Sequence, residues 1–156
     1  MEFEKIHNKG QARLFKNQYV EYLTKTHPLV IWGMYLPVLI LLPYYSFHTL
    51  HFNSTSLFLF FIGGMFFWTL TEYILHRFAF HYHAETERGK KLNYILHGNH
   101  HEYPRDKERL FMPAAPSLII ASVLFILMYL VLRKNVFPFF PGFMFGYLIY
   151  GSMHYA

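Results

Sequence analysis

Histidine is the residue type in this chain that offers the most chemistry. The 156 residues include 11 histidines and no cysteine. Six of the histidines form a spaced pattern, which consists of His76, His81, His97, His100, His101 and His154. Imidazole is a common ligand for iron, zinc and copper, so the pattern predicts a bound metal. Because cysteine is absent, thiolate sites, iron–sulfur clusters and disulfides are excluded, and nitrogen and oxygen must hold the metal.

The second group of histidines has helical spacing. Residues three and four positions apart share one face of an α-helix. His97, His100 and His101 have this spacing, and we expect them to bind metal from one rigid element. Chance clustering is the weaker interpretation, because isolated histidines gain nothing from such placement.

The first group has a different spacing. His76 and His81 are five residues apart, which is about 140° around an ideal helix of ~3.6 residues per turn. They can face one ion only through a local distortion; otherwise they serve two ions or lie on either side of a helix end. Glu72, one turn before His76, is predicted to accept the free imidazole N–H and to fix its tautomer. Alternatively, Glu72 pairs with Arg77 or with another basic residue.

The remaining histidines have a simpler interpretation. A lone histidine at a membrane interface is usually an amphipathic anchor. This class is assigned to His7, His27, His48 and His51. His83 is either a spare ligand or a solvated ring.

The charged residues are strongly segregated along the chain. Apolar residues make up 54% of the sequence and charged residues 15%. No charged residue occurs in residues 26–71, 110–132 or 135–156. These stretches are long enough to cross a hydrocarbon layer, which needs about 20 helical residues. The sequence therefore predicts an all-α, multi-pass integral membrane protein.

About four transmembrane helices are expected. They lie near residues 29–47, 56–75, 114–132 and 136–153. Small residues let membrane helices approach closely. The predicted close-packing positions are Gly63, Gly64, Gly142, Gly146 and Gly151.

Basic residues predict the orientation of this bundle. Twelve lie before the first span or in residues 76–113, against two between the third and fourth spans, Arg133 and Lys134. Basic residues favour the cytoplasmic side. Four crossings then return the chain to that side at His154, so all six patterned histidines form part of a cytoplasmic-side, histidine-rich cap.

Residues 1–28 are predicted to form an interfacial N-terminal helix. Phe15, Tyr19, Tyr22 and Leu23 repeat at helical spacing opposite charged positions. A solvated helical tail is the alternative. The formal charge of +5 fits an anionic lipid surface, and the spans favour lipid over nucleic acid as the partner.

Three sequence motifs resemble one family closely. They are EYILHRFAFH at residues 72–81, HGNHH at residues 97–101, and P-x-D-x-x-R-L-x-x-P at residues 104–113. They resemble the fatty acid 2-hydroxylase branch of the fatty acid hydroxylase and sterol desaturase superfamily. The resemblance is weaker but visible over residues 8–32, and it resumes at residues 146–150 and at His154-Tyr155. Residues 29–156 are thus identified as a membrane hydroxylase domain.

The resemblance implies an activity and a ligand set. It implies a membrane di-metal oxygenase, generally di-iron, that uses O2 to hydroxylate carbon 2 of a long-chain fatty acyl group, typically in sphingolipid. The ligands carried over by position are His76, His81, His97, His100, His101 and His154. Imidazoles alone do not distinguish iron from zinc, so a purified sample can hold zinc. Electrons are expected from an external donor of the cytochrome b5 or ferredoxin type. The expected location is the endoplasmic reticulum in a eukaryote or the inner membrane in a bacterium, with the site on the cytoplasmic face.

Two departures from the family pattern accompany the resemblance. The family usually has an aspartate after the tyrosine that Tyr150 matches, and Gly151 stands there. The family also continues beyond His154 with a further histidine and a last His-x-x-His-His box, which the expected domain lacks. Two alternatives therefore stay open: a histidine-rich metal-binding or transport protein of the membrane, and a truncated, inactive relative of the hydroxylases.

Three residues are predicted to bind substrate. Asp106 and Arg109 follow the second histidine group, where Arg109 offers a bidentate fork to a carboxylate or phosphate. The alternative is an interfacial salt bridge that pins this loop. Tyr150, in the last span, is the third predicted substrate residue.

Overall fold

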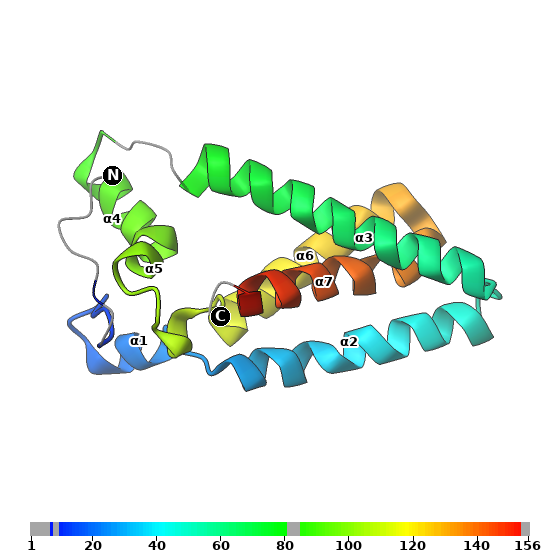
Figure 1. Cartoon of the computed structure of the whole chain (residues 1–156), viewed down its shortest axis with the longest axis horizontal. Helices are drawn as coiled ribbons and strands as arrows, with labels where there is room; N and C mark the ends of the chain where they lie inside the picture. Colours follow the sequence, from blue (N-terminus) through cyan, green and yellow to red (C-terminus); the bar gives the residue numbers. More distant parts are fainter. Residues whose placement is uncertain (1–6, 8–9, 81–84, 154–156) are drawn as a thin grey trace.

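The computed structural model describes residue 7, residues 10–80 and residues 85–153, and this part of the chain forms helices without a strand. Four long helices dominate (Figure 1). They are α2 (Pro28–His48), α3 (Ser54–Ile74), α6 (Ala114–Leu132) and α7 (Val136–Met153). Each corresponds to one of the four apolar stretches predicted from the sequence.

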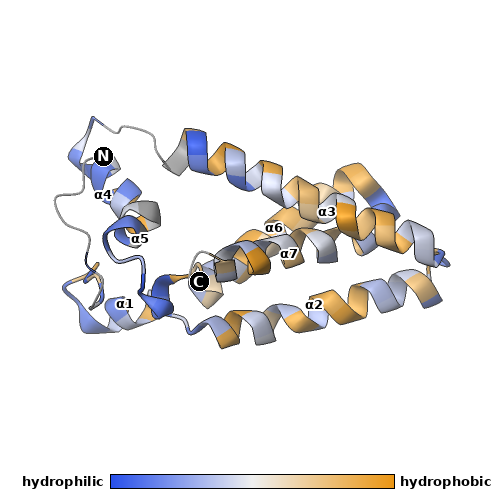
Figure 2. Cartoon of the chain, in the orientation of Figure 1, coloured by the Kyte–Doolittle hydropathy of each residue, from blue (hydrophilic) through white to orange (hydrophobic). Residues whose placement is uncertain are grey.

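Shorter elements form a cap at one end of the long helices (Figure 1). The cap contains α1 (Gln18–Leu23), η1 (Leu75–Phe80), α4 (Glu87–Asn93), η2 (Tyr94–Gly98), α5 (Asn99–Glu102) and η3 (Lys107–Arg109). At the other end, η4 (Arg133–Asn135) joins α6 to α7. Hydrophobic residues follow the long helices, whereas the cap is mostly hydrophilic (Figure 2).

The long helices are suited to a membrane. Three segments of the described chain are long and apolar enough to span one: Pro28–His48, Ser54–Phe78 and Lys107–Met153. The third segment includes both α6 and α7, which run in opposite directions in Figure 1. The chain is therefore an integral membrane protein, and the four separate crossings stay a prediction.

The first two long helices begin at side chains that cap them. The Nδ1 atom of His27 accepts the N–H of Leu29 at 3.3 Å, and Pro28 occupies the first turn. The side chain of Asn53 accepts the N–H of Ser56 at 2.8 Å. Both contacts satisfy a backbone donor that the first helical turn leaves unpaired. His27, predicted to be an interface anchor, is thus a helix cap.

Helix α7 is the most buried of the long helices. Its Phe143 and Leu148 side chains are almost inaccessible, at 1% and 0% exposure. A Cβ atom at Gly142 would overlap the backbone of Phe61, and one at Gly64 would lie 2.7 Å from the backbone nitrogen of Phe143. Helices α3 and α7 therefore pack backbone against backbone, as the glycines predicted.

Hydrogen bonds tie α2 to its neighbours. The Tyr35 hydroxyl and the Ser117 Oγ of α6 are 2.7 Å apart and buried. Near the start of α2, Trp32 Nε1 donates to Ser152 Oγ of α7 at 3.2 Å. The second bond brings the end of α7 beside the start of α2. The last described turn of the chain therefore lies at the cap end of the bundle (Figure 1).

The predicted N-terminal helix over residues 1–28 is wrong for most of its described part. Only Gln18–Leu23 is helical, because Asn17 caps α1 by accepting the N–H groups of Tyr19 and Val20. Residues 10–17, here called the N-terminal strap, are not helical. The Glu21 carboxylate accepts the N–H groups of Leu14 and Phe15 at 3.0 and 2.9 Å, and this satisfies backbone donors of the strap without a helix. The interfacial position of this segment stays a prediction.

Candidate metal centre

The first histidine group lies on a π-helix. Helix α3 continues directly into η1, whose six residues include His76. Hydrogen bonds in a π-helix join residues five apart, so each residue turns through a smaller angle than in an α-helix. Positions i and i+5 therefore come closer to one face. A π-helical turn is a local distortion of the kind that would let His76 and His81 face one ion, and whether they do so stays a prediction. His81 itself lies outside the described residues.

The second histidine group also includes a π-helical turn. His97 belongs to η2, and His100 and His101 belong to α5, so the single regular α-helix expected over these positions is interrupted. Asn99, which is 7% exposed, stabilises the turn. Its Nδ2 atom donates to the carbonyl oxygens of Tyr94 and Ile95 at 3.1 and 2.7 Å.

The structure brings the two histidine groups together. The ring centroids of His76 and His101 are 6.4 Å apart, with an interplanar angle of 64°. These rings come from separate elements, η1 and α5, so tertiary packing and not local spacing creates the contact. Rings from the two groups thus share one location at the cap end of α3.

The other predicted ligands are only partly described. His81 and His154 lie outside the described residues, as do the side chains of His97 and His100. Among the side chains that the structure describes, no group of three or more His, Asp or Glu residues is arranged to hold a metal. The complete six-histidine ligand set therefore stays a prediction, with His76 and His101 as its described pair.

Glu72 and Tyr150 connect α3 to α7 one helical turn before His76. The Tyr150 hydroxyl lies close enough to the Glu72 carboxylate for the two groups to interact electrostatically. Two predicted site residues therefore lie near each other beside the first histidine group. The roles of Glu72 toward His76 and of Tyr150 toward substrate stay predictions.

Two cap residues stabilise the end of α5. The Tyr94 hydroxyl donates to Glu102 Oε2 at 2.5 Å, and the backbone N–H of His7 donates to the Glu102 carbonyl at 2.8 Å. Burial, followed by the adjacent Glu102 carboxylate, raises the pKa of Tyr94 well above its ordinary value. The hydroxyl therefore stays a hydrogen-bond donor throughout the physiological pH range.

His7 also contacts this part of the cap through its ring. It stacks on Tyr103 with ring centroids 5.0 Å apart. The sequence predicted an interface anchor at His7, whereas the structure packs it beside the second histidine group. No local spacing signals this contact, because His7 and Tyr103 lie far apart in the sequence.

Asp106 and Arg109 form a buried ion pair. The Arg109 side chain is 4% exposed and that of Asp106 is 3% exposed, with 3.0 Å between Nη1 and Oδ2. Nη1 of Arg109 also donates to the Ala12 carbonyl, and Nη2 pairs with Glu21 at 2.5 Å. The guanidinium fork binds groups within the protein, which supports the alternative of a salt bridge that pins the loop. The head-group role of Asp106 and Arg109 stays a prediction.

The carboxylates around this ion pair are held in their charged form. Burial acts to raise the pKa of Glu21, but hydrogen bonds from Phe15, Arg109 and Leu14 outweigh it and leave the pKa below its ordinary value of 4.5. A hydrogen bond from Gln11 lowers the pKa of Glu108, and Lys25 adds to the effect. Charged groups thus attach the strap to the loop that follows the second histidine group, here called the second histidine segment.

Comparison with known proteins places this arrangement in context. The sequence profile of the family described as Fatty acid hydroxylase matches residues 61–156. The chain is 36% identical over 155 residues to the ceramide very long chain fatty acid hydroxylase SCS7 of Saccharomyces cerevisiae, with coverage of 96% of this chain and 39% of the yeast protein. It is 34% identical over 145 residues to the dihydroceramide fatty acyl 2-hydroxylase FAH2 of Arabidopsis thaliana, with coverage of 92% and 60%.

A solved structure has the same fold. It is described as full-length scs7p with only the hydroxylase domain visible, and it matches with a TM-score of 0.82 at 35% sequence identity. The match covers 94% of this chain and 56% of that chain. The predicted all-α membrane fold is therefore confirmed. The chain spans between 39% and 60% of the lengths of the two curated relatives.

Proposed function

The chain belongs to the fatty acid hydroxylase family, and on this basis we propose that it forms the membrane domain of an O2-dependent enzyme that hydroxylates carbon 2 of a long-chain fatty acyl group. The proposed substrate is a sphingolipid or a related lipid. Relatives described as ceramide and dihydroceramide hydroxylases support this substrate class. The membrane-embedded helices support a substrate that enters from the lipid phase.

The contact between His76 and His101 is the observation that carries the proposal. The two rings belong to the two separate histidine motifs, and their centroids are 6.4 Å apart. A purely structural histidine would gain nothing from meeting a second histidine, because two imidazoles that protonate together repel each other. A shared metal site explains the juxtaposition.

Iron is the proposed cofactor, with two ions in the complete protein. The donors available in this part of the cap are imidazole nitrogens and carboxylate oxygens, which suit non-haem iron and also accept zinc. The proposed ligands are His76, His81, His97, His100, His101 and His154. Bound iron would supply the activation of O2 that attack on an unreactive C–H bond requires.

The chain's own residues are proposed to orient the site and to surround the acyl chain. Tyr150 of α7 interacts with Glu72 of α3, and this contact supports a role for both residues in positioning the base of η1. We assign to Glu72 the orientation of the His76 ring and to Tyr150 a contact with the substrate. The apolar surfaces of the long helices leave the acyl chain in a hydrocarbon environment.

The remaining partners follow from the reaction. Insertion of one oxygen atom from O2 and reduction of the other to water consumes two electrons, so we propose an external donor of the cytochrome b5 or ferredoxin type. The surplus of basic residues in the cap segments supports a cytoplasmic location for the site, in the endoplasmic reticulum or in a bacterial inner membrane.

Product analysis in the full-length protein tests the proposal. The complete reading frame is expressed in cells that lack 2-hydroxylated lipids, and these lipids are measured by mass spectrometry. The His101→Ala variant should lose the product and bind less iron. His48→Ala is the matched control, because His48 lies in the last turn of α2 at the opposite end of the bundle.

Two results would contradict the proposal. One is an unchanged amount of 2-hydroxylated lipid in His101→Ala. The other is uptake of zinc into proteoliposomes by the wild-type protein without product formation, which would favour a metal-transport protein.

A further inference from the structure

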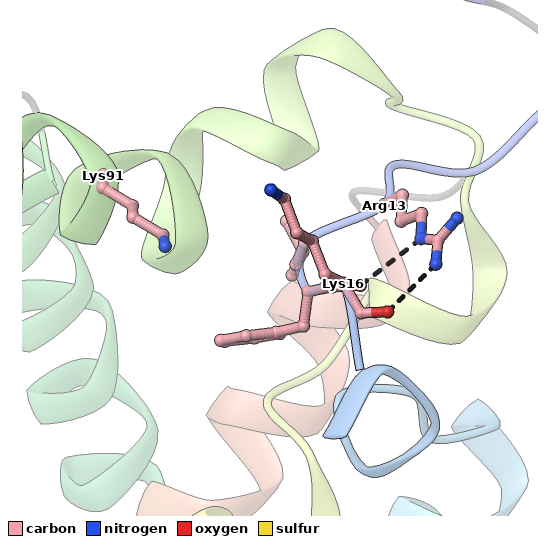
Figure 3. Close-up of a pocket in the computed structure, with 5 residues that line it drawn as sticks. Arg13, Lys16 and Lys91 are labelled. Carbon is pink, nitrogen blue, oxygen red and sulfur yellow. Dashed lines mark hydrogen bonds between the residues drawn. The ribbon is translucent and has the colours of Figure 1, made fainter. Parts of the chain in front are cut away.

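A basic pocket lies between the N-terminal strap and α4, and no histidine lines it. Its volume is about 510 Å³, and it is lined by Arg13, Leu14, Phe15, Lys16 and Lys91. The Lys16 and Lys91 side chains extend toward the space between the two segments (Figure 3). Arg13 also lines the pocket, but its guanidinium group lies on the side of the strap away from Lys91 and donates to the carbonyl oxygens of Phe15 and Lys16 at 3.4 and 3.1 Å (Figure 3).

No described carboxylate pairs with these three cations. Glu21 of α1 is already paired with Arg109, and Glu87 of α4 with Lys90 at 2.8 Å. Arg13, Lys16 and Lys91 form no ion pair with a described residue. The pocket therefore presents the positive charges of Lys16 and Lys91, with that of Arg13 on the adjoining strap, and a bound anion would stabilise them.

The surroundings of the pocket favour a lipid as the source of the anion. Helix α1 begins two residues after Lys16 and exposes Tyr19, Tyr22 and Leu23 at 79%, 78% and 73%. Exposed aromatic and aliphatic side chains next to basic residues are typical of a segment at the membrane interface. Because α2 begins at Pro28, only a short connection separates α1 from the membrane-spanning part.

The shape and lining of the pocket fit one head group. A concave space of this volume holds a small charged group, whereas docking of a protein surface needs a much larger area. Leu14 and Phe15 add an apolar wall beside the cations, as suits a ligand with both a charged and an apolar part.

We propose that this pocket binds the phosphate group of an anionic membrane lipid. The bound lipid bridges the strap, through Lys16, to α4, through Lys91. Helix α4 continues into η2 and α5, which carry the second histidine group. An occupied pocket therefore attaches that group to the membrane surface. This inference does not depend on the proposed oxygenase activity, because it concerns charge and shape alone.

Lipid titration of the purified chain tests the inference. Binding of phosphatidylglycerol and of phosphatidylcholine with identical acyl chains is measured by native mass spectrometry in an uncharged detergent. We expect the wild type to prefer phosphatidylglycerol. The double variant Lys16→Gln/Lys91→Gln should bind it about 30-fold more weakly, which corresponds to about fivefold for each basic residue near an anionic lipid.

Two further variants separate the pocket from general surface charge. Arg88→Gln/Arg105→Gln removes the same number of charges from exposed positions of the cap that do not line the pocket, and it should retain nearly wild-type binding. Lys16→Arg/Lys91→Arg keeps the charges and should also bind, which guards against misfolding as the cause of any loss.

Three outcomes would overturn the inference. They are equal affinity of the wild type for both lipids, equal weakening in the Arg88/Arg105 control, and competition by inorganic phosphate at the same concentration as the lipid. The last result would assign the pocket to a free phosphate ion.

Discussion

Replacement of Arg109 by glutamine should detach the N-terminal strap from the second histidine segment. The guanidinium group contacts Glu21, Asp106 and the Ala12 carbonyl, and its side chain is 4% exposed. Glutamine cannot reach all three acceptors and carries no charge. The variant therefore leaves two carboxylates without their cation.

The expected magnitude follows from the burial of those carboxylates. Asp106 is 3% exposed and Glu21 is 15% exposed. Removal of one partner of a buried ion pair typically costs about 3–5 kcal/mol. Asp106 keeps hydrogen bonds from Gln11 at 3.3 Å and from the Glu108 backbone at 3.1 Å, so we expect a value near the lower end, about 3 kcal/mol.

Hydrogen exchange measures this local loss directly. The strap and α1 can open without unfolding of the long helices. A loss of about 3 kcal/mol in their stability corresponds to roughly a hundredfold faster hydrogen exchange in residues 10–26, which include both segments. The control Arg105→Gln changes an exposed residue and should stay within about 0.5 kcal/mol of the wild type.

A double-mutant cycle identifies the cause. Glu21→Gln combined with Arg109→Gln should destabilise the strap by less than the sum of the single changes, with a coupling of about 0.5–3 kcal/mol. Unchanged exchange in Arg109→Gln, together with a raised KM for lipid, would refute the reasoning and restore the head-group role of Arg109.

Three further predictions concern pH and helix packing. The pKa values of Glu21 and Glu108 in the folded state lie below 4.5. The contribution of these carboxylates to cap stability should therefore be complete above pH 4.5 and should fall as acidification passes through the lower folded pKa values. Hydrogen exchange in the strap that slows on acidification, after correction for the intrinsic rate, would contradict this. Gly142→Ala should destabilise the bundle by about 1–3 kcal/mol in thermal unfolding, because the added Cβ would overlap the Phe61 backbone. In the control Gly33→Ala, the added Cβ meets no atom within 4 Å, so this change should be neutral or stabilising. Equal effects of the two changes would argue against the close approach of α3 and α7. Tyr35→Phe removes the buried hydrogen bond to Ser117 and should cost about 0.5–2 kcal/mol, and a thermal midpoint unchanged from the wild type would show that this bond contributes nothing.

The long helices could be predicted from the sequence because their signal is local. A run of about 20 apolar residues must satisfy its backbone within one helix when lipid surrounds it. The predicted ranges 114–132 and 136–153 therefore coincide with α6 and α7. The sequence signal for the close packing of α3 and α7 was also local, because each helix carries glycines where the two backbones meet.

The cap could be predicted only in part, because its contacts are distant in sequence. The periodicity of Phe15, Tyr19 and Tyr22 predicted a long amphipathic helix. In the structure, the helix begins only at Gln18, because Asn17 caps its N-terminus. One partner of Arg109, Glu21, lies 88 residues away, so the sequence left the role of Arg109 open between substrate binding and a salt bridge. The π-helical turns have no side-chain periodicity of their own, although the five-residue spacing of the first histidines indicated that some distortion was needed.

Gly151 shows why a departure from a family pattern has to be judged with its neighbours. By sequence alone, glycine at this position is the loss of the aspartate usual in the family. In the structure, a Cβ atom at Gly151 would lie 2.8 Å from Cδ1 and Cζ of Phe111, whose side chain is 4% exposed. The Phe111 ring packs on Tyr147 with centroids 5.5 Å apart, so it fills the space beside α7 that a side chain at 151 would need. Glycine at 151 therefore leaves the space that the Phe111 ring fills, and any larger side chain at this position would require Phe111 to move.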